Sequence, residues 1–344
     1  MKQVAITGKL ECAVVEKPEP RIQNEFVLVK ILVAPMCTEY KAYLNGEVSD
    51  CLGHEAAGEV ATVARKGSLK PGDRVVVMPQ FACGRCEFCV SGEYIHCQHA
   101  LDPLKACGSQ TGIATYAQYC IKQDWLLLPI PDDLSTEHAA MACCGLGPSF
   151  GAVRAMKLAG GETVLITGMG PVGLGAVINA TYRNAKVIAM EGSKYRAAKA
   201  MELGAWKVVD PTDPDALKIV KSFTGGRGVD KAIECCGVPA AQKLTVEATC
   251  RKGHVCFIGW KGHVEIDNWV LDGLTLQGCW HWNLRDTPAM FRTIRDNAKK
   301  LDALITHRFG MDQVKDAFEL QAIGNCGKTL LLPWGQQDEA RRIR

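Results

Sequence analysis

The stretch T-V-L-I-T-G-M-G-P-V-G, from Thr163 to Gly173, decides the fold of this chain. Its first five residues have the composition of a buried strand, and three glycines then follow in the pattern G-x-G-x-x-G. Such glycines let the backbone approach a pyrophosphate, and the N-terminus of the following helix offers amide donors and the positive end of its dipole. The positions expected to hold a dinucleotide are Gly168, Gly170, Pro171, Val172 and Gly173.

The same alternation of strands and helices continues toward residue 283. We expect strands at 163–167, 186–190, 206–209, 229–234, 253–259 and 275–278, with helices starting at residues 171, 194, 215 and 239. Short apolar runs that alternate with helical patterns indicate βαβ units. The sequence therefore predicts an α/β unit built on a doubly wound parallel sheet with helices on both faces.

The chain before about residue 149 has a different pattern. Strand-like runs at 26–33, 57–63, 73–78 and 116–121, with the turn Pro71-Gly72-Asp73, predict a β-rich domain. After residue 286 we expect helices at 287–300 and 311–322, a closing strand at 328–333 and a frayed polar tail at 334–344. The change near residue 149 is the clearest predicted domain boundary.

An acidic residue stands where a dinucleotide site needs one. Glu191 ends the second expected strand, 23 residues after Gly168, where a carboxylate can accept hydrogen bonds from ribose hydroxyls. The same charge repels a 2′-phosphate, so the sequence favours NAD over NADP. The alternative is a phosphate held by Ser193, Lys194 and Arg196, which follow directly.

Four cysteines form the strongest local motif. Cys83, Cys86, Cys89 and Cys97 lie within fifteen residues. Four thiolates at such spacing can surround Zn²⁺ tetrahedrally and leave no open position. We therefore predict a structural zinc site.

A second group of possible metal ligands is scattered along the chain. It consists of Cys37, the triplet Gly53-His54-Glu55 and the pair Cys143-Cys144. Two thiolates and one imidazole around Zn²⁺, with the fourth position open, form a Lewis-acid site for an alcohol. A packed core cysteine or histidine is the alternative for each of these residues.

The composition excludes some classes of function. The chain has 344 residues and carries 40 basic and 37 acidic residues, a formal net charge of +3, without a long basic run, so we expect no nucleic-acid partner. No stretch reaches the ~18 apolar residues of a membrane span, and Met1 to Leu10 lacks a signal-peptide core, so we expect no membrane partner. Seventeen cysteines in such a chain indicate metal ligands and buried thiols, and hence the cytoplasm.

Several motifs in this order resemble the zinc-containing alcohol dehydrogenase family of medium-chain dehydrogenases, including its polyol and threonine dehydrogenase branch. Besides the four cysteines and the glycine loop, they are Gly53-His54-Glu55 with Ala57-Gly58-Glu59-Val60, Pro71-Gly72-Asp73-Arg74-Val75, Tyr116-Ala117-Gln118-Tyr119, Glu234-Cys235-Cys236-Gly237 and Gly327-Lys328. The resemblance implies a β-rich GroES-like catalytic domain of residues 1–148 and 284–344 and a Rossmann domain of residues 149–283. It also implies a homodimer or homotetramer.

The resemblance implies a catalytic zinc beside the structural one, two zinc ions per chain in all. Its ligands would be Cys37, His54 and a third residue, with Glu55 as an alternate ligand or a neighbouring group. Cys144, 24 residues before Gly168, is the expected third ligand, and Cys143 is the alternative.

One segment departs from the family pattern. The family reads Cys-Gly-Ser/Thr-Asp, whereas this chain reads Cys37-Thr38-Glu39. Either Thr38 takes the hydroxyl role through a one-residue deletion, or Glu39 accepts the proton of the alcohol. A third possibility is that Glu39 lies only on a solvated turn.

The function implied is hydride transfer to NAD from a secondary alcohol such as a polyol, a sugar or a related polar alcohol. The alternatives are an NADPH-linked aldehyde or ketone reductase, and a non-catalytic zinc protein that senses the NAD/NADH ratio. The segment Trp280-His281-Trp282 is expected either to line the substrate cleft or to pack a subunit contact.

Overall fold

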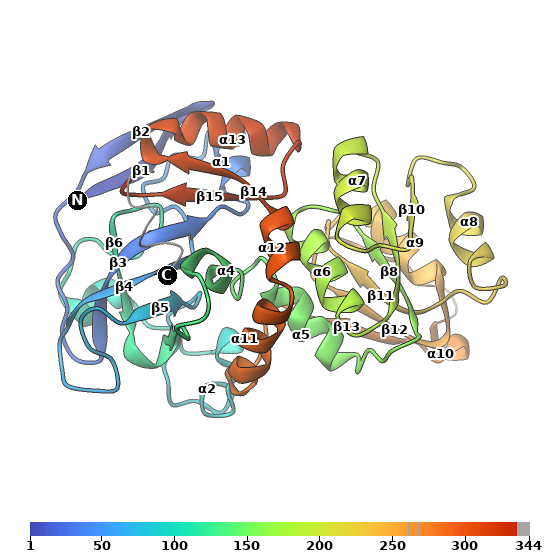
Figure 1. Cartoon of the computed structure of the whole chain (residues 1–344), viewed down its shortest axis with the longest axis horizontal. Coiled ribbons are helices and arrows are strands. Elements are labelled where there is room, and N and C mark those ends of the chain that lie inside the picture. Colours follow the sequence, from blue (N-terminus) through green and yellow to red (C-terminus); the bar gives the residue numbers. More distant parts are fainter. Residues whose placement is uncertain (261, 267–268, 336–344) are drawn as a thin grey trace. The chain divides into compact units, whose positions relative to one another are not determined.

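The fold is taken from a computed structural model that describes residues 1–260, 262–266 and 269–335 (Figure 1). The chain divides into two compact units. Unit 1 comprises Met1–Cys143, Asn283–Ala298 and Ile305–Arg344, and unit 2 comprises Cys144–Trp282 and Lys299–Leu304. The main change of unit thus falls five residues before the boundary expected at residue 149, and the short segment 299–304 belongs with unit 2.

Unit 2 contains one parallel sheet of six strands in the order β10-β9-β8-β11-β12-β13. Its strands are β8 (Thr163–Thr167), β9 (Lys186–Met190), β10 (Lys207–Val209), β11 (Val229–Glu234), β12 (Thr249–Phe257) and β13 (Thr275–Gly278). Its helices are α5 (Gly147–Ala155), α6 (Pro171–Thr181), α7 (Lys194–Glu202), α8 (Ala216–Ser222), α9 (Pro239–Glu247) and α10 (Trp269–Asp272). The order reverses between β8 and β11, which is the point where doubly wound sheets bind ligands at the carboxyl ends of their strands. The predicted doubly wound sheet is confirmed.

The predicted elements of unit 2 agree closely with the observed ones. Strands β8, β9, β11 and β13 have the predicted bounds, and α6, α7 and α9 start where the sequence placed them. Strand β12 begins four residues earlier than predicted, because Thr249 already pairs with Val229 before the register shifts. All five residues of β8 are buried, as expected for a central strand of a parallel sheet.

Unit 1 is β-rich, as predicted. A seven-stranded sheet has the path β14-β15-β3-β4-β5-β7 with β6 paired to β3, and β1 and β2 form a separate antiparallel pair. The strands are β1 (Lys2–Gly8), β2 (Glu11–Glu16), β3 (Phe26–Pro35), β4 (Ala56–Val63), β5 (Arg74–Val77), β6 (Tyr119–Gln123), β7 (Leu127–Pro129), β14 (Ile305–Gly310) and β15 (Lys328–Leu332). The α-helices are α1 (Glu39–Asn45), α2 (Glu87–Val90), α3 (Pro103–Cys107), α4 (Thr136–Ala140), α11 (Thr287–Asp296), α12 (Ala298–Leu304, mostly counted with unit 2) and α13 (Val314–Ile323).

Several elements of unit 1 differ from the sequence prediction. The pair β1-β2 was not predicted, and β2 buries none of its residues, so it has no apolar pattern to detect. The helix predicted at 287–300 is two helices, because Asn297 leaves the helical region with φ −112° and its side-chain amide donates to the carbonyl of Thr293. The helix predicted from residue 311 begins as a short 3₁₀ turn, Met311–Gln313.

The tail predicted to fray from residue 334 begins with an anchored residue, which corrects that expectation. Trp334 Nε1 donates to the carbonyl of Ile31 at 2.9 Å, and its ring packs edge-on against Tyr119. An indole that is partly buried with its N–H paired holds a chain end in place. The rest of the predicted tail, residues 336–344, lies outside the described residues.

Trp282 belongs to the core of unit 2, which corrects both expectations for this residue. It is 1% exposed and packs edge-on against Phe150. Trp280 is 40% exposed and meets the ring of Trp260.

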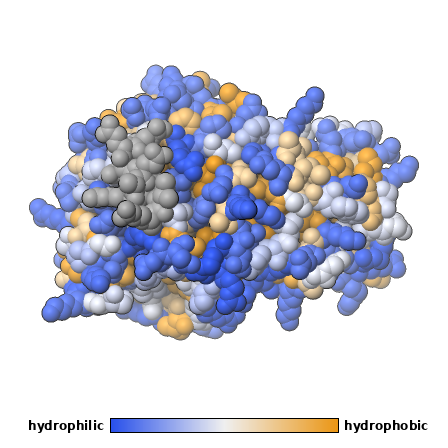
Figure 2. All heavy atoms as spheres, viewed as in Figure 1, coloured by the Kyte–Doolittle hydropathy of each residue, from blue (hydrophilic) through white to orange (hydrophobic). Residues whose placement is uncertain are grey.

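Hydrophilic residues predominate on the face shown in Figure 2, with apolar ones scattered among them. None of the helices in the described part of the chain is long and apolar enough to cross a membrane.

Candidate metal centres and nucleotide site

The structure brings together four residues from three separate segments into one group of possible metal ligands. Cys37 follows strand β3, His54 and Glu55 come just before β4, and Cys144 lies in the turn after α4. One ligand atom from each of these four residues lies within 4.8 Å of all the others. The end of β3, just before Cys37, pairs with the start of β4, just after Glu55, so this strand pair fixes two of the segments.

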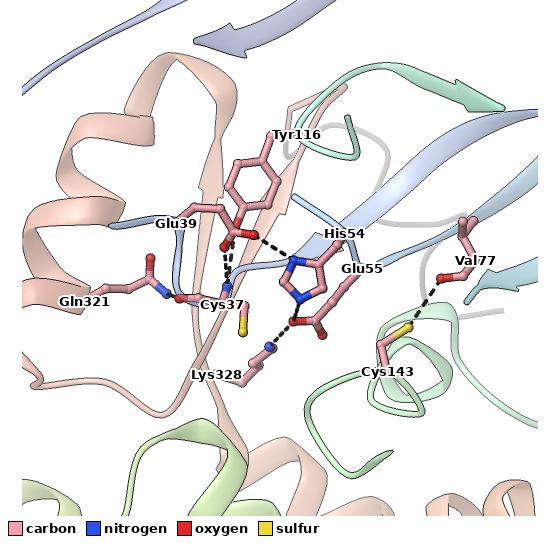
Figure 3. A network of polar contacts seen from close by, with 9 residues as sticks. All are labelled: Cys37, Glu39, His54, Glu55, Val77, Tyr116, Cys143, Gln321 and Lys328. Atoms are coloured by element: carbon pink, nitrogen blue, oxygen red, sulfur yellow. Dashed lines mark hydrogen bonds and ion pairs between the residues drawn. The ribbon is translucent and has the colours of Figure 1, made fainter. Parts of the chain in front are cut away.

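Glu39 orients the imidazole of His54 (Figure 3). His54 Nδ1 lies 2.9 Å from Glu39 Oε1, and His54 Nε2 lies 3.8 Å from Glu55 Oε1. An ionised carboxylate can only accept hydrogen bonds, so Nδ1 carries a proton and Nε2 is the nitrogen that would bind a metal. A carboxylate behind a histidine is the usual arrangement that fixes the tautomer of a zinc ligand.

The second oxygen of Glu39 is also occupied. Oε2 accepts from the hydroxyl of Tyr116 at 2.8 Å and from the backbone N–H of Cys37 at 3.2 Å. The side chain of Glu39 is only 12% exposed. The possibility that Glu39 lies on a solvated turn is therefore wrong.

The electrostatics of this pair favour an ionised carboxylate. Burial opposes the ionisation of Glu39, but the hydrogen bond and charge of His54 outweigh it and lower its pKa to about 2. Burial likewise opposes the charging of His54, yet its contacts with Cys37 and Glu39 raise its pKa to about 11. A metal at Nε2 would displace that proton, so metal binding and proton release are coupled at this site.

Glu55 is buried and paired with Lys328. Lys328 Nζ lies 2.8 Å from Glu55 Oε1, and neither side chain is exposed. Burial raises the pKa of Glu55 to about 7, against the opposing charge of Lys328. The carboxylate is thus held beside the other ligands and is already partnered from behind.

The two adjacent cysteines are placed differently. Cys144 belongs to the ligand group, whereas Cys143 is buried and its Sγ donates to the carbonyl of Val77 at 3.4 Å. Burial raises the pKa of Cys143 far above its usual value. The geometry therefore supports Cys144 as the third ligand.

The four-cysteine lobe has the dimensions of a closed zinc site. The Sγ atoms of Cys83 and Cys89 lie 3.9 Å apart, those of Cys86 and Cys89 3.4 Å, and those of Cys86 and Cys97 3.9 Å. Tetrahedral Zn–S bonds of ~2.3 Å require sulfur atoms ~3.8 Å apart. Backbone N–H groups of Cys83 and Cys86 point at these sulfurs, which stabilises thiolates. The residues present fit a structural zinc ion.

The glycine loop leaves room for a ligand at one position and none at two others. Gly168 has φ +83°, and a Cβ at Gly173 would lie 1.8 Å from the carbonyl oxygen of Gly168. A Cβ at Gly170 would meet nothing within 4 Å, so that backbone faces open space at the start of α6, where Pro171 and Val172 follow. The loop thus combines tight packing with an exposed backbone, as a pyrophosphate site requires.

Glu191 contacts this loop, and Arg196 follows Glu191 on the next helix. Glu191 accepts hydrogen bonds from the backbone N–H of Met169 at 2.8 Å and of Ser193 at 2.9 Å. Among the described residues, Arg196 Nε is buried without a hydrogen-bond partner. Glu191 directly follows β9, and Arg196 lies near the start of α7, where the sequence placed them.

Two residues that support the ligand group were not predicted to do so. Tyr116 and Lys328 served only as family markers in the sequence, yet Tyr116 contacts Glu39 and Lys328 contacts Glu55. Lys328 is signalled by its position, because it is the one charged residue of the apolar strand β15. Tyr116 has no comparable signal.

Comparison with known families defines the class of the protein. Residues 23–132 match the alcohol dehydrogenase GroES-like domain, and residues 171–296 match the zinc-binding dehydrogenase domain. The chain belongs to the zinc-type alcohol dehydrogenase family of medium-chain dehydrogenases, in the branch of polyol and threonine dehydrogenases.

Curated relatives and solved structures agree with this assignment. The chain is 30% identical to the sorbitol dehydrogenase of Bacillus subtilis, with 97% of each chain covered, and 33% identical to the L-threonine 3-dehydrogenase of Symbiobacterium thermophilum, with 92% of this chain and 93% of the relative covered. It is similar to the crystal structure of 2R,3R-butanediol dehydrogenase from Bacillus subtilis, with a TM-score of 0.83, 26% identity and coverage of 96% of this chain and 99% of that one.

Proposed function

We propose that this protein is an NAD-linked, zinc-dependent dehydrogenase that oxidises a secondary alcohol such as a polyol, a sugar or a related polar alcohol. The observation that carries the proposal is the ligand group Cys37, His54, Glu55 and Cys144, with His54 held by Glu39 and Glu55 held by Lys328. Its donors are two sulfurs, one imidazole nitrogen and one carboxylate that already has a partner. This set suits a zinc ion with a position left for substrate.

Zinc at Cys37, His54 and Cys144 would supply a Lewis acid that lowers the pKa of a bound hydroxyl, and NAD would supply the hydride acceptor. Oxidation of an alcohol to a carbonyl removes one hydride, which NAD would accept, and one proton from the hydroxyl, which residues of the chain would carry away. The chain must therefore provide a route for that proton.

Thr38 is the proposed proton carrier. Thr38 is exposed, and its side chain makes no capping hydrogen bond to α1, so the hydroxyl is available next to Cys37. Glu39 is less suited to this role, because both of its oxygens are already occupied and its pKa is about 2. Glu39 instead positions His54, and Tyr116 in turn holds Glu39.

The glycine loop and Glu191 support NAD as the cofactor. The backbone at Gly170 would accept the pyrophosphate, and Glu191, which contacts the backbone of the loop at Met169, would accept hydrogen bonds from ribose hydroxyls and repel a 2′-phosphate. Arg196, with its buried Nε unpaired in the described structure, is the feature that favours NADP as the second candidate. None of the seventeen cysteines forms a disulfide, which supports a cytoplasmic location.

The deciding experiment measures metal content and cofactor reduction together. The purified protein should hold two zinc ions per chain by elemental analysis, and Cys37→Ser should retain one. Reduced-nicotinamide absorbance should appear with NAD⁺ and a panel of polyols, sugars and simple secondary alcohols, and be weaker with NADP⁺. A protein that binds NADH but oxidises none of the panel would be the non-catalytic sensor, and one that reduces carbonyls with NADPH alone would be the reductase.

A further inference from the structure

A cavity of about 170 Å³ lies within unit 1 against the proposed zinc ligand His54. Its wall includes Gly53, His54, Gln80, Phe81, Thr115 and Lys122, and most of the remaining wall is aliphatic. For comparison, an engineered protein cavity of ~150 Å³ holds a benzene molecule. The space thus suits a fragment of about six or seven non-hydrogen atoms, one end of which reaches His54.

Lys122 gives this cavity a positive charge that the chain does not neutralise. It lies on β6 and is 4% exposed, and no carboxylate of the described residues is within ion-pair distance of its Nζ. Its ammonium donates to the carbonyl of Gln80 at 2.8 Å and lies 3.7 Å from the ring centroid of Phe81. An ammonium has three N–H donors, so further hydrogen-bonding capacity remains.

The charge on Lys122 persists at neutral pH. Burial lowers its pKa to about 8, and the neighbouring thiols of Cys120 and Cys143 act in the opposite direction. A buried, unpaired charge is unfavourable, and an anion that binds beside it relieves that penalty.

Two further features of the wall indicate a polar ligand. Thr115 Oγ1 is buried and has no hydrogen-bond partner in the described structure, although it borders the cavity. Gln80 adopts φ +66°, a left-handed conformation that is unfavourable for a residue with a side chain and that recurs at functional sites. Its carbonyl in this conformation is the one that fixes Lys122 Nζ.

We propose that Lys122 and Thr115 bind the carboxylate of the substrate, so that the alcohol presented to the zinc site belongs to a short hydroxy acid. This inference rests on the proposed function, because it names the substrate class for the same zinc site. One ammonium, one hydroxyl and an otherwise largely apolar wall suit a single negative charge. Lys122 is then the residue that determines specificity.

The test compares an acid with its neutral counterpart of nearly equal size. The zinc-loaded enzyme with NAD⁺ is assayed on 3-hydroxybutanoate and on 3-hydroxybutanamide, and the ratio of their kcat/KM values is recorded. We expect the wild type to prefer the acid, and Lys122→Met to lower the ratio about 10- to 100-fold, as loss of a hydrogen bond to a charged group does. Thr115→Val should lower the ratio in the same direction by a smaller factor. The Thr115→Val variant therefore still tests the inference if Lys122→Met folds poorly.

A matched control replaces a lysine of the same sheet that lies elsewhere. Lys30 on β3 packs over the ring of Trp334 and does not border the cavity, so Lys30→Met should leave the ratio of acid to amide unchanged. Equal kcat/KM for acid and amide in the wild type, or an unchanged ratio in both Lys122→Met and Thr115→Val, would overturn the inference while alcohol oxidation itself still stands.

Binding of butanoate gives a readout that does not depend on turnover. Calorimetric titration of the zinc-loaded protein with butanoate should show binding that Lys122→Met weakens at least tenfold and Lys30→Met does not. If no alcohol is oxidised but this binding is seen, the proposed function fails and the anion site stands. Absence of butanoate binding to the wild type would overturn the anion site.

Discussion

Lys328 Nζ lies 2.8 Å from Glu55 Oε1 with both side chains fully shielded from solvent, although the two residues are 273 positions apart in the sequence. The contact joins β15, the last strand of the described residues, to the segment that carries His54. A buried carboxylate at this place needs a partner, because removal of one member of such a pair leaves an uncompensated charge.

Lys328→Met should therefore destabilise the zinc-loaded protein by about 3–5 kcal/mol at neutral pH, measured by chemical denaturation. The double variant Glu55→Gln/Lys328→Met removes both charges and should recover most of that loss. Equal stability of Lys328→Met and the wild type would show that Glu55 is neutralised in another way, by protonation or by another cation.

Thr38→Val should keep both zinc ions while it lowers the turnover of alcohol by ~10²- to 10⁴-fold, as loss of a proton carrier does. The substitution removes the hydroxyl at nearly constant volume. Zinc analysis and steady-state kinetics on the same sample separate the two effects. A variant that turns over within a factor of two of wild type would assign the proton to another group.

Glu39→Gln should act on the metal, because it weakens the contact that orients His54. Loss of a carboxylate behind a ligand histidine lowers metal affinity ~10- to 100-fold. We expect a weaker zinc dissociation constant in a chelator competition assay, with much of the rate restored at excess zinc. If zinc binding is normal and the rate alone falls by two orders of magnitude or more, Glu39 is the proton acceptor after all.

Cys89→Ser should lower folding yield and thermal stability more than it lowers the rate per folded, zinc-replete molecule. A closed four-thiolate site contributes to folding, whereas it touches no substrate. Cys51→Ser, which replaces an exposed cysteine outside both metal groups, is the matched control. A stable Cys89→Ser protein with one zinc ion lost and no activity would contradict a purely structural role.

Glu191→Ala should weaken NAD binding and relax discrimination against NADP, since one carboxylate both binds ribose hydroxyls and repels a phosphate. Arg196→Ala is the companion variant and should affect NADP more than NAD. Fluorescence titration with both reduced cofactors measures each effect. Unchanged affinities in Glu191→Ala would mean that Glu191 serves only the backbone N–H groups of Met169 and Ser193.

The buried amine of Lys122 also predicts a pH dependence of stability. Its pKa falls from 10.5 to about 8 in the folded protein because burial disfavours the charged form. Between these pH values the unfolded chain retains a proton that the folded chain has released, so the contribution of Lys122 to stability rises with pH. The Tm of Lys122→Met minus that of the wild type should thus be largest below pH 8 and shrink toward pH 10.5. A difference that stays constant across this range would contradict the shifted pKa.

The sequence predicted best what depends on neighbouring residues. The glycine loop, the strand β8 and the four cysteines are encoded within short segments, and the structure gives β8 the predicted bounds. The contacts of Glu39 with His54 and Tyr116 span 15 and 77 positions, so no local pattern reveals them. Lys122 was missed for a related reason, because a single lysine in a strand looks like a solvent-facing residue until the sheet is assembled.

The contact between Glu39 and His54 depends both on the length of the Glu39 side chain and on the length of the loop after Cys37. The family pattern has a shorter aspartate three residues after the cysteine, whereas here the glutamate stands two residues after Cys37 and still reaches Nδ1 of His54. Its extra methylene compensates for the missing residue. We expect neither change alone to keep this contact, because a short loop with aspartate would leave the carboxylate away from the imidazole and a long loop with glutamate would crowd it. The two changes are therefore expected to show strong epistasis, and a graft of this loop into a relative will succeed only if both are transferred together.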